Sequence, residues 1–417
     1  MNAPSIVRPP RRCRFCEEPV SRSFIDLGVS PLCQTHIAED QLSAAEQFYP
    51  LHAFVCDACF LVQLDEFVAP ESIFSEYAYF SSYSTSWVEH AKRYSDEVTE
   101  RFKLDNRSLV MEVASNDGYL LQHFVARGIP ARGIEPAANV AEAAIQRGVP
   151  TDVCFLGSDT ADALVERHGR ANVVVGNNVF AHVPRLNDFV SGLAKLLAPG
   201  GVLTLEFPHL ARLMDQTQFD TIYHEHFSYF SFLTAERVLG KQGLAVFDVQ
   251  QLPTHGGSLR VFAGHGVSLP EAPSERVAQL QAAEREAGFE TIARYQGFGA
   301  QVARVKRDLL EFLISAKRDQ RRVVGYGAPG KGNTLLNYCG IRTDFLDFTV
   351  DANPYKQGKF TPGTRIPILH PDAIRRERPD FVLILPWNLR DEILGQAAYA
   401  RDWGAKFVTA IPRLEIF

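Results

Sequence analysis

The chain lacks several features that would assign it at once to a broad class. It has no run of about 18 apolar residues, which excludes a membrane-spanning helix. It also has no excess of positive charge: 43 Lys and Arg stand against 49 Asp and Glu, so it lacks the basic field of a non-specific nucleic-acid binder. No low-complexity tract or repeat is present. We therefore expect a globular protein whose partners include neither nucleic acid nor membrane.

The opening sequence, MNAPSIVRPPRRCRFC, lacks the apolar stretch of a secretory signal, so we expect a cytoplasmic protein. In a reducing compartment, cysteines serve as metal ligands or buried thiols more often than as disulfides. Two C-x-x-C pairs present the four thiolates that a structural zinc ion prefers, and a closed set of four stabilises a fold without doing chemistry. Buried or redox pairs are the alternative. The expected zinc ligands are Cys13, Cys16, Cys56 and Cys59.

The length of 417 residues exceeds what a single hydrophobic core usually supports, so the chain is expected to form several α/β domains. We expect a small zinc-binding domain over 1–75, a nucleotide-binding domain over 76–270, and a helical connector with a Rossmann-like domain over 271–417. Cys33, Cys154 and Cys339 lack partners at knuckle spacing and are interpreted as structural thiols.

The middle segment alternates apolar strands with helical stretches, a pattern typical of a doubly wound parallel sheet. In such a sheet the ligand lies beyond the carboxyl ends of the strands. The segment 253–264, PTHGGSLRVFAG, is interpreted as a second site loop. The expected strands cover 108–113, 131–136, 151–157, 171–180 and 200–208.

The first strand of this sheet leads into the loop EVASNDGYLL, which predicts an adenosine-type ligand. Glu135 follows Glu112 by 23 residues and stands where such folds place the acid that binds ribose hydroxyls. The loop keeps one glycine and lacks the G-x-G-x-x-G that a pyrophosphate requires, so S-adenosylmethionine fits better than NAD. A scaffold with a vacant site is the alternative. The expected cofactor-binding residues are Glu112, Ala114, Asn116, Gly118, Glu135 and Asn177.

The third segment begins with a long helical region over 274–322, in which Ser274 can cap the first turn. A strand, a glycine-rich turn and a helix follow over 321–340. The turn matches G-x-x-x-x-G-K, but Gly332 stands where a nucleotide triphosphatase needs Ser or Thr for magnesium. We instead expect Lys331, at a helix N-terminus, to form an anion site for a nucleotide diphosphate. A tight turn without a ligand remains the alternative.

The sequence YHEHFSYFS, residues 223–231, concentrates groups that transfer protons. In an extended strand His224 and His226 would share one face and Tyr223 and Glu225 the other. A metal pair of the H-x-H type and a polar loop without a task are the alternatives. Histidine, with an ordinary pKa near 6.5, suits a general base at neutral pH.

The chain resembles the S-adenosylmethionine-dependent C-methyltransferases that act on nucleotide-linked 4-keto deoxysugars. The matching elements are the cysteine set, EYAYFSSYS, EVASNDGYLL, YHEHFSYF, HGGSLR and GYGAPGKGN, and they span almost the whole chain in order. The resemblance implies an N-terminal zinc domain, a central class I methyltransferase domain and a C-terminal Rossmann-like domain. It also implies a monomer that methylates carbon 3 of the sugar, with the substrate held between the domains.

By the same resemblance, the catalytic residues are His226, Glu225, Tyr223 and Tyr77, with His226 as the base that forms an enolate. Glu225 could orient the imidazole if the chain turns there; otherwise Glu225 contacts the sugar and His224 supports the fold. His182 is interpreted as structural. The expected substrate-binding residues are Tyr79, His224, His255, Arg260 and Lys331.

Three rival functions use the same residues. An O- or N-methyltransferase would keep the donor site and a base without needing a ketone. A non-catalytic scaffold would bind nucleotide sugars, but it has no need of clustered His, Glu and Tyr. A nicotinamide-dependent sugar oxidoreductase would use the third segment as its cofactor domain.

Overall fold

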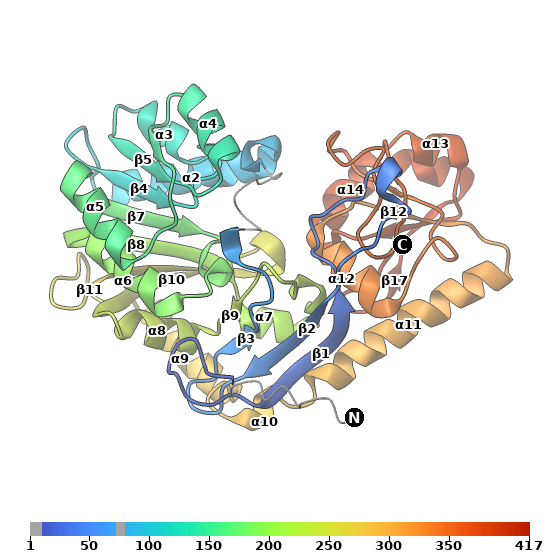
Figure 1. Cartoon of the computed structure of the whole chain (residues 1–417), viewed down its shortest axis with the longest axis horizontal. Coiled ribbons are helices and arrows are strands. Elements are labelled where there is room, and N and C mark those ends of the chain that lie inside the picture. The colour runs from blue at the N-terminus through green and yellow to red at the C-terminus, as the bar shows by residue number, and fades with distance from the viewer. Residues whose placement is uncertain (1–10, 72–79) are drawn as a thin grey trace, which may run out of the picture.

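The computed structural model describes residues 11–71 and 80–417, and it has two lobes (Figure 1). One lobe holds a seven-stranded sheet and the other a six-stranded sheet. Strands β1 and β2 and the long helix α11 run along the base where the lobes meet. Tyr77 and Tyr79, two of the expected site residues, lie outside the described residues. No helix of the described chain is both long and apolar enough to cross a membrane.

A four-stranded antiparallel sheet joins the N-terminal region to the central lobe. Its last strand, β9, follows directly after the YHEHF segment and pairs Tyr229 with Val62 of β3. The segment that precedes β2 extends along the C-terminal lobe, where Ile37 bridges to Phe360. The N-terminal region therefore contacts both lobes. Its strands, in sheet order, are β1 (Arg22–Ser30), β2 (Tyr49–Val55), β3 (Val62–Leu64) and β9 (Ser228–Tyr229).

The central sheet has the predicted doubly wound core, in which five parallel strands run in the order β6-β5-β4-β7-β8. The third expected strand is shorter than predicted, since only its first two residues pair. The strands are β4 (Val110–Val113), β5 (Ala131–Ile134), β6 (Thr151–Asp152), β7 (Ala171–Asn177) and β8 (Leu197–Pro208). The helices of this lobe are α2 (Thr85–Arg101), α3 (Leu121–Val125), α4 (Ala138–Gln146), α5 (Ser158–His168), α6 (Leu186–Leu196), α7 (Leu210–Asp215) and α8 (Phe232–Gly240).

Two further strands extend the central sheet beyond β8. β11 (Ser258–His265) runs antiparallel to β8 and lies between it and β10 (Leu244–Leu252). Only the first part of 253–264 is therefore a loop, and the interpretation of the whole segment as a site loop was wrong. The reason is burial: residues 258–264 are all buried, so both faces of this strand are covered.

The connector after the central sheet is three helices rather than one: α9 (Glu275–Glu286), α10 (Ile292–Tyr295) and α11 (Phe298–Arg318). The breaks coincide with Gly288 and Gly297, whose positive φ values of 84° and 87° end a right-handed helix. Ser274 occupies the N-cap position, but its hydroxyl donates to Asp248 instead of capping the helix.

The C-terminal lobe is a Rossmann-like sheet with five parallel strands and one antiparallel edge strand. The glycine-rich turn leads from β12 into α12 as predicted. In sheet order, its strands are β14 (Ile368–Leu369), β13 (Thr349–Val350), β12 (Val323–Tyr326), β15 (Phe381–Ile384), β16 (Lys406–Thr409) and β17 (Glu415–Ile416). Its helices are α12 (Gly330–Cys339), α13 (Ala373–Glu377) and α14 (Arg390–Gln396).

Candidate active site

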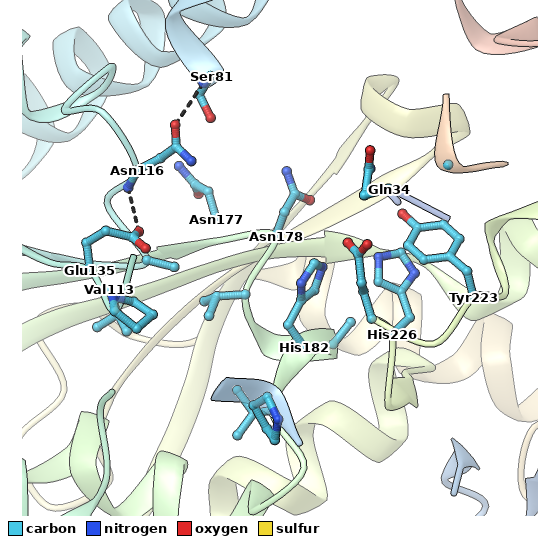
Figure 2. Close-up of a pocket in the computed structure, with 18 of the residues that line it drawn as sticks. Gln34, Ser81, Val113, Asn116, Glu135, Asn177, Asn178, His182, Tyr223 and His226 are labelled. Carbon is cyan, nitrogen blue, oxygen red and sulfur yellow. Dashed lines mark hydrogen bonds between the residues drawn. The ribbon is translucent and has the colours of Figure 1, made fainter. Parts of the chain in front are cut away.

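A cavity of about 990 Å³ is lined by all three parts of the chain. The N-terminal region contributes Gln34 to His36, and the C-terminal lobe contributes Lys331 and Lys356 among others. Figure 2 shows Asn116, Glu135 and Asn177 on one side of the cavity and His182, Tyr223 and His226 on the other. We call the first side the donor end, because residues expected to bind the methyl donor lie there. We call the second side the acceptor end, because residues of the YHEHF segment lie there.

The donor end forms where β4 and β5 finish. Ala114 and Asn116 have left-handed backbone conformations, with φ of 57° and 49°, so the chain turns sharply at the carboxyl end of β4. The carboxylate of Glu135, at the end of β5, accepts from the backbone N–H of Asn116 and of Ala137, each at 2.9 Å. The Asn116 side chain in turn accepts from the backbone N–H of Ser81 at 2.8 Å (Figure 2). These hydrogen bonds hold the Glu135 carboxylate in one position at the wall of the cavity.

Four of the six predicted cofactor residues line the cavity: Ala114, Asn116, Glu135 and Asn177. Glu112 and Gly118 do not. Glu112 is fully buried, and burial raises its pKa well above the ordinary carboxyl value, so it is a neutral group beneath the cavity wall. Gly118 has a φ of 77° and no room for a side chain, since an added Cβ would lie 3.0 Å from Val149 Cγ2. These two residues shape the loop. They do not line the cavity, which differs from the direct cofactor contacts expected for them.

The acceptor end is built on a turn, not on a strand. The backbone N–H of His226 donates to the Tyr223 carbonyl at 2.9 Å, which closes a β-turn over 223–226. Tyr223, Glu225 and His226 therefore all line the cavity, although an extended chain would have put Glu225 and His226 on opposite faces. The sulfhydryl of Cys33, from the N-terminal region, donates to Glu225 Oε1 at 3.4 Å.

His226 is held as a neutral imidazole. Its Nδ1 donates to the Thr221 carbonyl at 2.9 Å, so Nδ1 carries the proton and Nε2 is left as the basic atom. The expectation that Glu225 fixes this tautomer was wrong, because a backbone carbonyl does so. Burial, and to a lesser degree the neighbouring His182, hold the pKa of His226 well below 6.5. The side chain is uncharged at neutral pH.

His182 belongs to the acceptor end, contrary to the structural role expected from sequence. Its ring centre lies 4.8 Å from that of His226, and the Tyr223 ring centre lies 4.1 Å from His226 on its own turn. Burial lowers the pKa of His182 to about 4, so it too is neutral. His182 ends the short helix η3 (Phe180–His182) just after β7. Its position beyond a strand's carboxyl end was the signal available in the sequence.

Of the predicted substrate residues, His255 and Lys331 line the cavity, whereas His224 and Arg260 do not. His224 Nε2 contacts the Pro50 carbonyl at 3.2 Å, which agrees with its alternative role of supporting the fold. Arg260 is only 3% exposed and pairs with Glu206 at 2.6 Å, so it is not available to an anion in the cavity. The expectation that Arg260 contacts the substrate was wrong. On strand β11 its side chain points toward Glu206 on the neighbouring strand and not into the cavity.

Lys331 lies at the start of α12, where the sequence placed it. Its ammonium donates to Asn388 Oδ1 at 2.8 Å and stands 4.5 Å from the centre of the Trp387 ring. Burial lowers the pKa of Lys331, opposed by the charge of Asp220. Lys356 and Lys359, from the same lobe, also line the cavity, and Lys356 pairs with Asp351 at 3.3 Å.

The four predicted metal ligands converge at one point of the N-terminal region. Their sulfurs lie within 4.8 Å of one another, and the pairs Cys13 with Cys59 and Cys16 with Cys56 are each 3.5 Å apart. A tetrahedral zinc with bonds of about 2.3 Å places its sulfurs about 3.8 Å apart, so the four thiolates fit zinc. His224 and His226 belong to no metal-ligating cluster among the described residues, so the H-x-H metal pair finds no support there.

Models of three protein families match successive parts of the chain. Residues 13–74 match a proposed zinc binding domain, 87–249 a methyltransferase domain, and 253–412 a C-methyltransferase C-terminal domain. Solved structures overlap with less than half of the chain. A magnesium protoporphyrin IX methyltransferase (ChlM) from Synechocystis PCC 6803 with bound SAM overlaps with 42% of this chain and 78% of its own, at 15% identity and a TM-score of 0.33. An S-adenosylmethionine-dependent methyltransferase from Clostridium acetobutylicum overlaps with 43% and 92%, at 9% identity and a TM-score of 0.35.

Similarity over the full length comes from the C-methyltransferase NovU of Streptomyces niveus. The two sequences are 35% identical over 407 residues, which is 98% of this chain and 97% of NovU. The chain therefore belongs to the S-adenosylmethionine-dependent C-methyltransferase family.

Proposed function

We propose that the protein methylates carbon 3 of a nucleotide-linked 4-keto deoxysugar, by removing a proton next to the ketone and joining the resulting carbanion to a methyl group. The observation that carries this proposal is the neutral, buried His226, whose Nε2 is left unprotonated, in one cavity with the acidic donor end. A carbon acceptor needs such a base, because its proton must leave before the carbon becomes a nucleophile.

The donor end suits S-adenosylmethionine, which supplies an electrophilic methyl group when bound. Glu135 offers carboxylate oxygens to ribose hydroxyls, and its two backbone hydrogen bonds hold it in place. Asn177 lines the cavity beside it and donates to the Tyr119 hydroxyl at 3.3 Å. These hydrogen bonds favour a fixed donor geometry.

At the acceptor end His226 Nε2 takes the proton. Its neutral state under physiological conditions is ensured by burial, and the Thr221 carbonyl keeps the accepting nitrogen facing away from the backbone. Tyr223 and His182, on either side of His226, are placed to donate to the oxygen that gains charge as the enolate forms. We assign the sugar hydroxyls to Glu225, whose contact with Cys33 positions it.

The C-terminal lobe supplies the wall for the nucleotide diphosphate. Lys331, Lys356 and Lys359 line it, and charged hydrogen-bond donors are the usual partners of phosphate oxygens. The zinc ion would be structural, since four thiolates leave no open position for a substrate. We expect a monomer, as the resemblance to the sugar C-methyltransferases implies.

Product analysis tests the proposal. The enzyme is incubated with a TDP-4-keto-6-deoxy sugar and S-adenosylmethionine whose methyl group carries carbon-13, and the product is examined by NMR. A label bonded to carbon, with loss of the proton at carbon 3, is the expected result. A label bonded to oxygen or nitrogen would instead favour the rival O- or N-methyltransferase on a nucleotide sugar.

A further inference from the structure

A buried cluster of charged side chains lies behind the cavity and contributes nothing to its lining. Glu206 on β8 and Arg260 on β11 stand directly opposite each other in the antiparallel register. Glu206 is fully buried and Arg260 is 3% exposed. His90 from α2 and Thr254 from η5 (Thr254–Gly256) complete this group, which we call the Glu206 cluster.

Three side chains contact the Glu206 carboxylate. Arg260 Nη2 lies 2.6 Å and His90 Nε2 2.9 Å from Oε2, while the Thr254 hydroxyl donates to Oε1 at 2.8 Å. Burial alone would raise the pKa of Glu206, but these partners lower it to about 2. The carboxylate is therefore ionised at any pH at which the protein works.

Thr254, which contacts Glu206, directly precedes His255, and His255 lines the cavity. His255 has a φ of 55°, a left-handed conformation that is uncommon for a residue with a Cβ. Asn178 Nδ2 donates to His255 Nε2 at 3.1 Å, so the ring proton is on Nδ1. Burial lowers the pKa of His255 to about 4, which leaves a neutral N–H donor.

The contact between Glu206 and His90 also leads to His255, through Trp87. The His90 ring stacks on Trp87, one turn earlier on α2, with ring centres 5.0 Å apart. Trp87 lines the cavity and meets the edge of the His255 ring at 5.2 Å. One carboxylate thus fixes the loop that carries His255 and the aromatic wall beside it.

From the far side, the C-terminal lobe holds the same loop. Gly256 and Gly257 have φ values of 92° and 124°, and an added Cβ on Gly256 would lie 2.4 Å from the Trp387 ring. The Gln218 side chain donates to the Gly256 carbonyl at 2.7 Å. The loop therefore has no room to move toward Trp387. Movement away from Glu206 would break the hydrogen bond to Thr254.

We infer that Glu206 is a positioning residue for methyl transfer: through Thr254 it holds His255 in its left-handed conformation, with the Nδ1 N–H available as a neutral donor to the molecule in the cavity. This rests on the proposed use of the cavity as the site of methyl transfer. The competing explanation is that Glu206 and Arg260 only hold β8 and β11 together. That explanation gives Thr254 no part in turnover.

Thr254→Val tests the inference, with Thr254→Ser as its matched control. Valine has nearly the shape of threonine but cannot donate to Glu206, whereas serine can. Glu206→Gln is less suitable because it also removes the carboxylate that pairs with Arg260 at 2.6 Å. We expect Thr254→Val to lower kcat by about 10-fold and Thr254→Ser to stay near wild type. Binding of S-adenosylhomocysteine, measured by calorimetry, should change little in either variant and shows that the fold is intact.

A double-mutant cycle with His255→Ala separates positioning from stability. If Thr254 acts through His255, Thr254→Val should have almost no further effect on kcat in the His255→Ala background. Effects on log kcat that add in the double variant would overturn the inference. A wild-type enzyme with no C-methyl transfer would instead count against the proposed function.

A spectroscopic readout is independent of turnover. Nitrogen-15 NMR of the imidazole groups, with the His255 signals assigned by their loss in His255→Ala, should show a single Nδ1-protonated tautomer in wild type and in Thr254→Ser. Thr254→Val should show a mixture of tautomers or exchange-broadened signals. Identical His255 signals in Thr254→Val and wild type would contradict the positioning role.

Discussion

The two ends of the cavity are built in different ways. The donor end comes from the carboxyl ends of three neighbouring strands, β5, β4 and β7, and backbone hydrogen bonds hold its Glu135 carboxylate. The acceptor end draws on η3, the 223–226 turn, the loop at His255 and the start of α12, and the N-terminal region supports it through Cys33. The donor end is thus a property of one sheet, whereas the acceptor end depends on how all three parts of the chain meet.

The strongest test of this difference is removal of zinc. The cysteine cluster sits beside β3, whose partner β9 directly follows the 223–227 segment. The Phe15 carbonyl next to it accepts from Asn187 at 2.9 Å, and the Cys59 carbonyl accepts from Thr234 at 3.3 Å. We expect Cys56→Ser to release zinc and abolish turnover, because the ion contributes to folding. Metal analysis and activity measure this result.

In the same variant, S-adenosylhomocysteine binding should be retained although turnover is lost. The strands of the donor end belong to the seven-stranded sheet and not to the four-stranded sheet beside the cysteine cluster. Calorimetry on the soluble fraction measures this binding. Equal loss of binding and turnover would mean that the two ends are not independently built. Cys339→Ser, which changes a cysteine outside both the cluster and the cavity lining, is the matched control.

Replacement of the base comes next in size. His226→Ala should lower kcat by about 10²- to 10⁴-fold, the usual contribution of general base catalysis, while S-adenosylhomocysteine binding stays near wild type. Steady-state kinetics and calorimetry measure the two quantities. His224→Ala is the control, because its ring contacts Pro50 and does not line the cavity. A fully active His226→Ala would move the proton transfer to another group.

Glu135→Gln should act on the donor end alone. The amide keeps the shape but loses the charge and one acceptor, so we expect S-adenosylhomocysteine to bind about 10-fold more weakly, as loss of a charged hydrogen bond predicts. kcat at saturating donor should change little. A variant that binds normally but turns over slowly would show that Glu135 acts on the chemical step and not on donor affinity.

The smallest effect concerns stability against pH. Histidine has a pKa near 6.5 when unfolded, and burial holds that of His226 well below this value. Below pH 6.5 the unfolded chain therefore binds a proton that the folded chain does not. The free energy of unfolding should fall as pH falls through this window, by at most about 1.4 kcal/mol per pH unit for His226.

His182 and His255, with pKa values of about 4, contribute in the same direction between pH 6.5 and 4. Urea unfolding at several pH values measures the slope. His226→Ala should reduce it, while His370→Ala, which changes an exposed histidine, should not. A slope unchanged in His226→Ala would mean that this histidine does not titrate as a buried group.

The same comparison explains what could be predicted from sequence. The strand ends and the acid at Glu135 follow from local periodicity and spacing, and four of the residues predicted to bind the cofactor line the cavity. Arg260 was misplaced because its direction depends on β11, a strand hidden in what reads as a loop. His182 was missed because its neighbour, His226, is distant in sequence and only the fold brings them within 4.8 Å.

Proton exchange at the acceptor end tests the central claim most directly. The enzyme is incubated in deuterated water with a TDP-4-keto-6-deoxy sugar and S-adenosylhomocysteine, which cannot donate a methyl group, beside a buffer control and the His226→Ala variant. The account predicts deuterium at carbon 3 with wild type only, read by mass spectrometry and NMR. Exchange by His226→Ala at the wild-type rate, or no exchange by a wild-type enzyme that methylates this sugar, would contradict it.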